Sequence, residues 1–201
     1  MVRMTDGSGN GPVTAIPDTI LLQRFREGDK DSFEALFERH YDLVYGVLFR
    51  LTGTRAEAED LTQEVFLKLY EHPLRHGDNV AGWLYRVAVN TGYNALRASQ
   101  RRAHREQLAA DPVERTATPE DAVSQREMLR DVRAALAQIP SRAAKLLILR
   151  EMAFSYREMA AIVGVAPASV GTLLARAQKA FEEAYIARTH ARLGHKRGGG
   201  S

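Results

Sequence analysis

The feature that most constrains this chain is the spacing of its apolar residues, which repeats at three and four positions. Between Phe33 and Leu51 one set of apolar side chains recurs at positions 33, 36, 37, 41, 44, 47, 48 and 51. That period places them on one face of a helix, whereas a half-buried strand alternates at every second residue. No run bounded by turn residues shows such alternation. The chain is therefore predicted to be all-α.

Start and stop signals divide the chain into further helices. Gly53 ends the first long helix, and Thr54-x-x-Glu57 then has the form of a capping box. Ser155-x-x-Glu158 is a second capping box. The helices after Gly53 are predicted over about 55–71, 80–104, a segment through Leu129 and Ile139 that Pro140 ends, and then about 141–152, 155–163 and 167–188.

A change in composition after Glu106 divides the helical pattern into two parts. The following stretch contains Asp111-Pro112, Thr118-Pro119 and several acids, which is typical of a linker. We therefore predict two small helical domains joined by a flexible linker. The predicted segments are a disordered leader at 1–16, a first domain at 17–106, the linker at 107–121, a second domain at 122–188 and a flexible tail at 189–201.

Composition and missing motifs exclude several classes of function. The chain has no Cys, so a disulfide framework, a thiol nucleophile and a Cys-ligated zinc site are all excluded. His72 and His76 have Pro73 between them and no third ligand nearby, so we predict no metal site. No catalytic constellation or phosphate-binding glycine motif indicates an enzyme or a nucleotide cofactor. With no apolar run of about 18 residues and no export signal, we expect a cytoplasmic protein without membrane insertion.

The net charge of +3 hides a strong segregation of charge along the sequence. No residue between Asp78 and Glu106 is acidic, and this stretch interleaves cations, aromatic rings and amides. Such side chains neutralise phosphates, stack on bases and read base edges, so the stretch favours a nucleic-acid surface. The alternative is a solvated basic helix end, and Trp83 taken alone fits a core position better. The stretch contains Trp83, Tyr85, Arg86, Asn90, Tyr93, Asn94, Arg97, Arg101, Arg102 and Arg105.

The helix before this stretch is acidic and would repel phosphate. Four of its residues, Asp60, Gln63, Glu64 and Leu67, share one stripe by helical spacing. An acidic patch with an apolar Leu fits a protein partner, and an ordinary solvated face fits the spacing equally well.

The segment from residue 155 onward has the form of a helix-turn-helix. A short capped helix, a turn at 164–166 and a helix that begins with Pro167 follow one another. The exposed side of the second helix is predicted to carry Ser169, Thr172, Arg176 and Lys179, which could reach bases or phosphates. An αα-hairpin inside a bundle is an equally good account of the spacing.

Four segments together resemble the extracytoplasmic-function sigma factors, the smallest class of sigma-70-type bacterial initiation factors. The resemblance covers about residues 19–187. The segments are LLQRFREGDKDSFEALFERHYDLVY, AEDLTQEVFLKLYEH, AGWLYRVAVNTGYNALRASQRR and IPSRAAKLLILREMAFSYREMAAIVGVAPASVGTLLARAQKAF. The second, which resembles the family's polymerase-binding helix, is the most specific.

The resemblance implies a sigma2-like domain, a sigma4-like domain and binding to core RNA polymerase and promoter DNA. Asp60, Gln63, Glu64 and Leu67 match the helix that docks on the polymerase clamp helices. The helix that approaches the −10 element carries Trp83, Arg86, Asn90, Asn94, Arg97 and Arg101. The residues expected to contact the −35 element are Ser169, Thr172, Arg176 and Lys179. An anti-sigma partner is also implied by the resemblance.

The resemblance extends to two connecting segments. The loop at about 72–79 matches one that captures a flipped base. The linker, with Asp111, Glu114, Glu120 and Asp121, matches a segment threaded toward the polymerase active site.

The last helix departs from the family pattern G-T-V-K-S-R-L-x-R-A-R. Gly171, Leu173 and Gln178 stand where basic residues are usual, and Arg176 keeps its charge. We therefore expect fewer −35 contacts or a different −35 sequence. In the −10 helix Asn94 replaces an Asp that is common in the family, which removes a charge that would repel phosphate.

The favoured function is a sigma factor that brings core polymerase to promoters and assists melting. A stand-alone helix-turn-helix regulator is one alternative, although it has no use for the acidic stripe. A decoy that binds polymerase or an anti-sigma protein without productive promoter binding is another, and it is motivated by Gly171 and Leu173.

Overall fold

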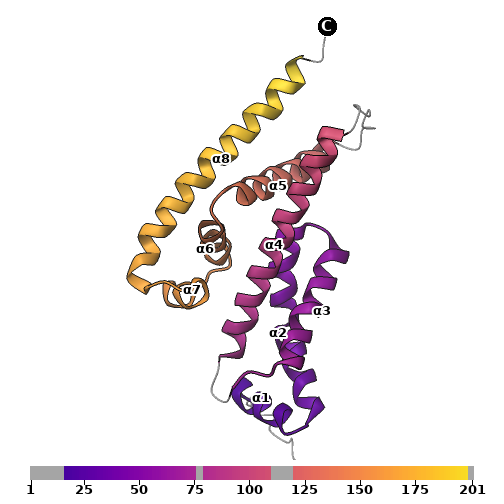
Figure 1. The fold of residues 1–201 in the computed structure, drawn as a ribbon, viewed down its shortest axis with the longest axis vertical. Coiled ribbons are helices and arrows are strands. Elements are labelled where there is room, and N and C mark those ends of the chain that lie inside the picture. The colour runs from indigo at the N-terminus through magenta and orange to yellow at the C-terminus, as the bar shows by residue number, and fades with distance from the viewer. Residues whose placement is uncertain (1–15, 76–78, 110–119, 199–201) are drawn as a thin grey trace, which may run out of the picture.

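The chain folds into helices only, as its apolar spacing predicts. The computed structural model describes residues 16–75, 79–109 and 120–198, and within these ranges no residue lies in a strand. The elements, labelled in Figure 1, are α1 (Asp18–Arg26), α2 (Lys30–Thr52), α3 (Arg55–Glu71), α4 (Val80–Ala109), α5 (Glu120–Gln138), α6 (Ser141–Glu151), α7 (Tyr156–Val163), the 3-10 turn η1 (Pro167–Ser169) and α8 (Val170–Gly198).

Helices α1–α4 form the N-terminal bundle, in which α2 packs between its neighbours. Its buried face carries Leu36, Val44 and Leu48, which lie in one core with Phe66 of α3 and Leu84 of α4. α4 approaches α2 closely because Gly92 faces it. A Cβ added to Gly92 would lie 2.7 Å from Leu51 Cδ1 and 3.1 Å from Leu48 Cδ2. The missing side chain therefore sets how tightly the two longest helices of the bundle pack.

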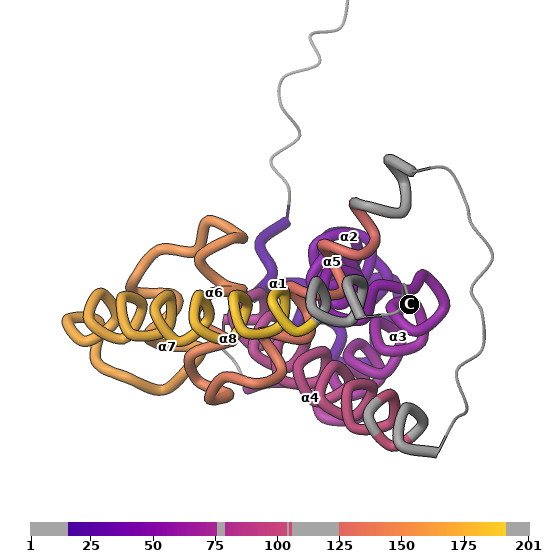
Figure 2. Tube along the Cα trace, turned by 90° about the horizontal axis from the view of Figure 1, so that it is seen from above, coloured from indigo at the N-terminus to yellow at the C-terminus, as the bar shows by residue number. Residues whose placement is uncertain are grey.

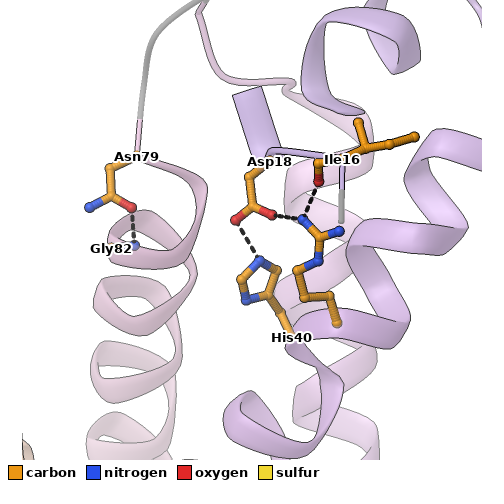
Figure 3. Close-up of polar contacts among 6 residues, drawn as sticks. Ile16, Asp18, His40, Asn79 and Gly82 are labelled. Carbon is orange, nitrogen blue, oxygen red and sulfur yellow. Dashed lines mark hydrogen bonds and ion pairs between the residues drawn. The ribbon is translucent and has the colours of Figure 1, made fainter. Parts of the chain in front are cut away.

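Polar contacts fix where the bundle begins and where α4 starts (Figure 3). The carboxylate of Asp18 bonds to Nε2 of the buried His40 at 2.8 Å and pairs with Arg39. Arg39 also donates to the Ile16 carbonyl at 2.8 Å, so the chain entering α1 is held against α2. At the start of α4 the Asn79 side chain accepts a bond of 2.9 Å from Gly82 N, which caps the helix.

Helices α5–α8 form the C-terminal domain, which contains the predicted helix-turn-helix. Ser155 caps α7 with the full capping box, and Gly164 ends it in the left-handed conformation with φ of +71°. The chain then turns by 104° into η1 and α8, within the range expected for this motif. Val170 and Leu174 of α8 are buried. The turn and the helix packing therefore agree with a helix-turn-helix.

The two parts of the molecule pack against each other along α4. In Figure 1 α4 runs between the bundle helices α2 and α3 on one side and α5–α8 on the other. Figure 2, seen from above, shows α6, α7 and the start of α8 to one side of α2 and α3. The Tyr93 hydroxyl donates to the Ile139 carbonyl at 3.1 Å, across 46 residues of sequence. Tyr85 meets Phe154 edge to face at 4.7 Å. One apolar cluster therefore continues from the bundle into the C-terminal domain.

Several boundaries differ from the expected ones. α4 continues to Ala109 and α5 begins at Glu120, so both ends of the predicted 107–121 linker are helical. α8 runs to Gly198 rather than ending near Arg188. The linker acids Asp111 and Glu114, the leader up to residue 15 and residues 76–78 of the predicted base-capturing loop lie outside the described residues.

The capping box predicted at Thr54 does not form. Thr54 is the N-cap residue, and its carbonyl accepts the first helical bond from Ala58 N at 3.1 Å, but its side chain makes no capping bond. The prediction was wrong because the sequence pattern shows only that the Thr54 side chain could cap α3. It does not give the direction of that side chain at the tight turn between α2 and α3. Here that connection is made by Gly53, which has a φ of +79°.

Within the described residues, each helix taken singly is too short or too polar to cross a membrane. α7 and the first part of α8 pass a test of length and apolarity only as a bent pair. Their apolar faces include Met159, Ala160, Val170 and Leu174, which are buried in the core of the C-terminal domain.

Candidate nucleic-acid and protein interfaces

The first candidate surface is the outer side of α3, here called the α3 stripe, made of Asp60, Gln63, Glu64 and Leu67. All four residues are exposed, and Leu67 keeps 53% of its surface in solvent. The opposite side of the helix is the buried one, so burial of α3 leaves the stripe outward. The charge of Glu64 is partly balanced by Lys68 Nζ at 2.6 Å. This surface offers one apolar anchor within an acidic rim, which suits a basic or polar protein partner.

The α3 stripe has a neighbour that the sequence reading missed. Tyr70 stands one turn beyond Leu67 and is 43% exposed, while its ring packs against Phe25 at 5.3 Å and Phe33 at 5.1 Å. An aromatic residue anchored by other rings is well suited to an interface. Tyr70 lies three residues after Leu67, and this spacing could have placed it on the same side of α3. The same spacing also fits a core residue.

The second surface is the α4 stripe, defined as Trp83, Arg86, Asn90, Asn94, Arg97 and Arg101. These residues follow one another at steps of three and four, so they share one face of a straight helix. Arg86, Asn94, Arg97 and Arg101 are exposed, whereas Trp83 and Asn90 are half-buried. The stripe is therefore a line of cations and amides with an aromatic ring at its N-terminal end. It has the chemistry to hold a nucleic-acid strand and read its bases.

The two tyrosines of the acid-free stretch do not belong to this surface. Tyr85 and Tyr93 are 8% and 1% exposed, and both turn toward the C-terminal domain. Burial raises the pKa of both phenols, because the charged form would lose its hydration. The prediction that aromatic rings interleaved with the arginines face nucleic acid is therefore wrong for these two residues in this structure. The partner that covers them lies far along the sequence, so periodicity could not identify it.

A pocket of 560 Å³ lies beside Trp83, between the start of α4 and α7. Its walls carry Arg86 from α4 and Arg157 and Glu158 from α7. The bond from Ser155 lowers the pKa of Glu158, so this carboxyl is ionised near neutral pH. Arg157 is a cation near the α4 stripe that sequence reasoning did not single out, because only the packing of α7 on α4 brings it there.

The third surface is the α8 stripe, defined as Ser169, Thr172, Arg176 and Lys179. All four residues are exposed, and the opposite side of the helix carries the buried Val170, Leu174 and Ala177. The stripe includes the N-terminal part of the second helix of the motif, which is the part that enters the major groove in helix-turn-helix proteins. The sequence reading thus assigned every member of this stripe to the correct side of the helix.

The described residues contain no group of three or more His, Cys, Asp or Glu side chains placed to hold a metal ion. What the described part of the chain presents is three exposed stripes on three different helices. Their chemistry is that of binding: one acidic and apolar, and two built from cations and small polar groups.

Two protein-family models match the chain. The model for Sigma-70 region 2 matches residues 36–102, which contain the α3 and α4 stripes. The model for Sigma-70, region 4, matches residues 129–181, which contain the α8 stripe. The family boundary therefore separates the same two groups of helices that the structure shows.

Similar proteins cover nearly the whole length of the chain. The RNA polymerase sigma factor CarQ of Myxococcus xanthus is 33% identical over 168 residues, which span 81% of this chain and 92% of CarQ. The ECF RNA polymerase sigma-E factor of Haemophilus influenzae is 31% identical over 179 residues, spanning 83% of this chain and 94% of that protein.

Among solved structures, CnrH in complex with the cytosolic domain of CnrY has the same fold. Its TM-score is 0.60 at 18% identity, covering 85% of this chain and 97% of that one. The family matches, the relatives and the fold agree. The chain belongs to the extracytoplasmic-function (ECF) sigma factors, which direct RNA polymerase to promoters.

Proposed function

We propose that each of the three stripes has a separate role in promoter recognition. The α3 stripe binds core RNA polymerase, the α4 stripe binds and opens the −10 element, and the α8 stripe reads the −35 element. The observation that carries this proposal is that the polar members of the stripes, apart from the half-buried Asn90, are exposed on helices that fall within the two sigma-70 regions. The two domains divide accordingly, the bundle engaging polymerase and the −10 element and the C-terminal domain the −35 element.

The role of the α3 stripe follows from its acidity and its exposed Leu67. Replacing Asp60 and Glu64 with Lys reverses two charges without touching the core, because both side chains are exposed. We expect this variant to lose binding to core polymerase in a pull-down assay. Glu34→Lys, an exposed position on α2, is the matched control and should bind normally. Normal binding of the Asp60/Glu64 variant would remove the α3 stripe as the polymerase site and would favour a stand-alone regulator.

The role of the α4 stripe follows from its mixture of groups. Arginines neutralise phosphates, Asn90 and Asn94 can bond base edges, and Trp83 can stack on an unpaired base. Opening the duplex then needs no catalytic residue, because protein contacts replace part of the lost base stacking. Permanganate footprinting of the holoenzyme tests this: Asn90→Ala with Asn94→Ala should reduce reactivity of thymines at −10 while leaving polymerase binding intact. Unchanged reactivity would contradict the assignment.

The role of the α8 stripe follows from its place at the start of the second helix of the motif. Arg176 and Lys179 supply cations, and Thr172 supplies a small polar group near the groove. Gly171 and Leu173, where the family usually has basic residues, should make the −35 contact weaker. DNase footprinting of the holoenzyme distinguishes the two hypotheses. Protection near −35 supports recognition of the −35 element by the α8 stripe. Absence of this protection at every promoter supports a decoy that does not bind promoters productively.

We further propose that the protein is a regulatory, non-catalytic one that acts with polymerase in the cytoplasm and is itself held by an anti-sigma partner. Support comes from the shared fold with CnrH, which was solved bound to the cytosolic domain of CnrY. Affinity purification of the chain from its source cells, with and without inducing stress, tests the partner. Recovery of core polymerase and no other stoichiometric protein under every condition would refute it.

A further inference from the structure

A pocket of 320 Å³ lies where α5 meets the bundle. Its walls come from the connection between α2 and α3, from α4 and from α5. The residues that line it include no member of the α3, α4 or α8 stripe. The roles proposed for the stripes therefore leave this pocket without a function.

Three arginines of α5 line the pocket. Arg126, Arg130 and Arg133 are spaced by four and three residues, so they share one face of the helix. Within the part of the chain that the structure describes, none of them forms an ion pair with a carboxylate. Guanidinium groups that are gathered without counter-ions repel one another, so the cluster favours the binding of an anion.

Arg133 is the least hydrated of the three arginines, because it is half-buried whereas the other two are exposed. Its Nε donates to the Arg50 carbonyl at 2.9 Å, and its Nη atoms make no hydrogen bond to a described residue. Gly53 leaves room for this guanidinium, since a Cβ at position 53 would lie 2.5 Å from Arg133 Cζ and 2.8 Å from Nη2. Burial lowers the pKa of Arg133, because the charged form has lost part of its hydration. An anion bound in the pocket would compensate for this loss.

The other walls of the pocket indicate which kind of anion fits. Leu51, Leu96 and Leu129 supply apolar surface, while Ser99 and Gln100 supply a hydroxyl and an amide. The planar fork of an arginine matches two oxygens of a phosphoryl group with two parallel hydrogen bonds. The volume of 320 Å³ lies at the lower end of the range for small-molecule sites. These walls therefore suit a small molecule that has both a phosphoryl group and an apolar part.

We propose that this pocket binds a phosphorylated small molecule, with its phosphoryl group on the three arginines and its apolar part against the leucines. Glu57 also lines the pocket, and its carboxylate limits the affinity because it repels a phosphate. The positive charges nevertheless outnumber the negative one in the lining, three to one. Because the walls belong to both domains, the bound molecule contacts α5 and the bundle at the same time.

Isothermal titration calorimetry of the full chain tests this site, in a buffer without phosphate, sulfate or divalent cations. The probes are inorganic pyrophosphate and ADP, which adds an adenine ring to a diphosphate. We expect each probe to saturate one site per chain. The affinity should fall as salt is added, since Arg126 and Arg130 are exposed and salt screens their charges. Failure of either probe to bind would overturn the proposal.

Paired substitutions separate this site from a general attraction of anions. Arg126→Gln with Arg130→Gln removes two cations from the lining and should weaken the binding of both probes by about tenfold or more. Arg142→Gln with Arg150→Gln is the matched control, because it removes the same charge from exposed positions on α6 that do not line the pocket. Circular dichroism confirms that each variant is folded. Equal weakening in the two double variants would overturn the proposal.

Substitution of Glu57 should change the affinity in the opposite direction. Glu57→Gln removes the one negative charge of the lining and nearly keeps the size of the side chain. We expect both probes to bind several-fold more tightly, because the repulsion of the phosphoryl group is lost. Unchanged or weaker binding would show that the probes bind elsewhere, and would overturn the assignment to this pocket.

The DNA backbone also carries phosphoryl groups, so it is the alternative source of the anion. Binding of a fluorescein-labelled DNA duplex of random sequence is therefore compared between the two double variants. We expect equal affinities, because the α4 and α8 stripes proposed to bind DNA lie outside the pocket. A loss of affinity confined to the variant with Arg126→Gln and Arg130→Gln would assign these arginines to DNA, and would overturn the small-molecule ligand.

Discussion

The same substitution, Gly to Ala, should have opposite effects at two helical positions of this protein. Gly171 lies in the first turn of α8, and a Cβ there would lie 3.6 Å from Tyr156 Cε2, an ordinary contact. Gly92 lies in the middle of α4, and a Cβ there would meet the side chains of Leu51 and Leu48 at 2.7 and 3.1 Å. Both leucines are fully buried, at 1% and 0% exposure, so neither can move aside freely.

The magnitudes follow from two opposing terms. Ala is favoured over Gly inside a helix by about 1 kcal/mol, a gain available at both positions. At Gly171 nothing opposes this gain, so the free energy of unfolding should rise by about 0.5–1 kcal/mol. At Gly92 the forced repacking costs about 1–3 kcal/mol, which leaves a net loss of about 1 kcal/mol. A change of 1 kcal/mol moves the Tm of a chain of this size by about 2–4 °C.

Thermal unfolding followed by circular dichroism at 222 nm measures both variants. Gly171→Ala should melt a few degrees above the parent protein, and Gly92→Ala a few degrees below it. The two sites lie in different domains with no shared contact, so the double variant should show the sum of the two shifts if the domains unfold together. A stabilising Gly92→Ala would show that α2 and α4 are not held at the separation described, and a destabilising Gly171→Ala would show that α8 does not begin as a regular helix.

Three further predictions concern the C-terminal domain and the α4 stripe. Ser155→Ala should destabilise α7 by about 1 kcal/mol, measured by urea unfolding, because it removes the cap. It should also raise the pKa of Glu158 toward 4.5, as followed by carboxyl NMR. Since the ionised form is the one stabilised, that advantage of the parent exists above pH 4.5 and disappears as pH falls through the lowered pKa. Arg176→Ala should weaken holoenzyme binding to promoter DNA by about 1–3 kcal/mol if Arg176 contacts a base. An equal loss of affinity for promoters that differ in the −35 sequence would indicate a phosphate contact instead. Arg97→Ala should lower the slope of log affinity against log salt by about one, and an unchanged slope would exclude Arg97 from phosphate binding.

Local sequence patterns predicted the parts of this fold that depend on near neighbours along the chain. The buried side of α2, the stop at Gly53, the capping box at Ser155 and the turn at Gly164 each depend on residues within about one turn of helix. The outward direction of the α3 and α8 stripes was predictable for the same reason. A helix with one apolar side must turn its polar side to solvent.

Apart from the Thr54 cap and several helix ends, the main features that the sequence did not predict are contacts between distant segments. Tyr85 and Tyr93 looked like members of a nucleic-acid surface because aromatic rings suit both DNA and a protein core. The choice between the two was made by Phe154 and Ile139, which are 69 and 46 residues away along the chain. The close approach of the Arg133 guanidinium to Gly53 could not be predicted from the sequence either. The positive φ of Gly53 already accounts for glycine at this position.

The close packing of α4 on α2 at Gly92 has a consequence for promoter architecture. Because α2 and α4 pack so closely there, the distance from the α3 stripe, proposed to bind polymerase, to the α4 stripe, proposed to bind the −10 element, should be constant. The α8 stripe, which we propose reads the −35 element, belongs to the other domain. Promoters that differ by a base pair in the spacer between the two elements should therefore be accommodated by movement of the C-terminal domain. The distance from the −10 element to the first transcribed base should stay the same.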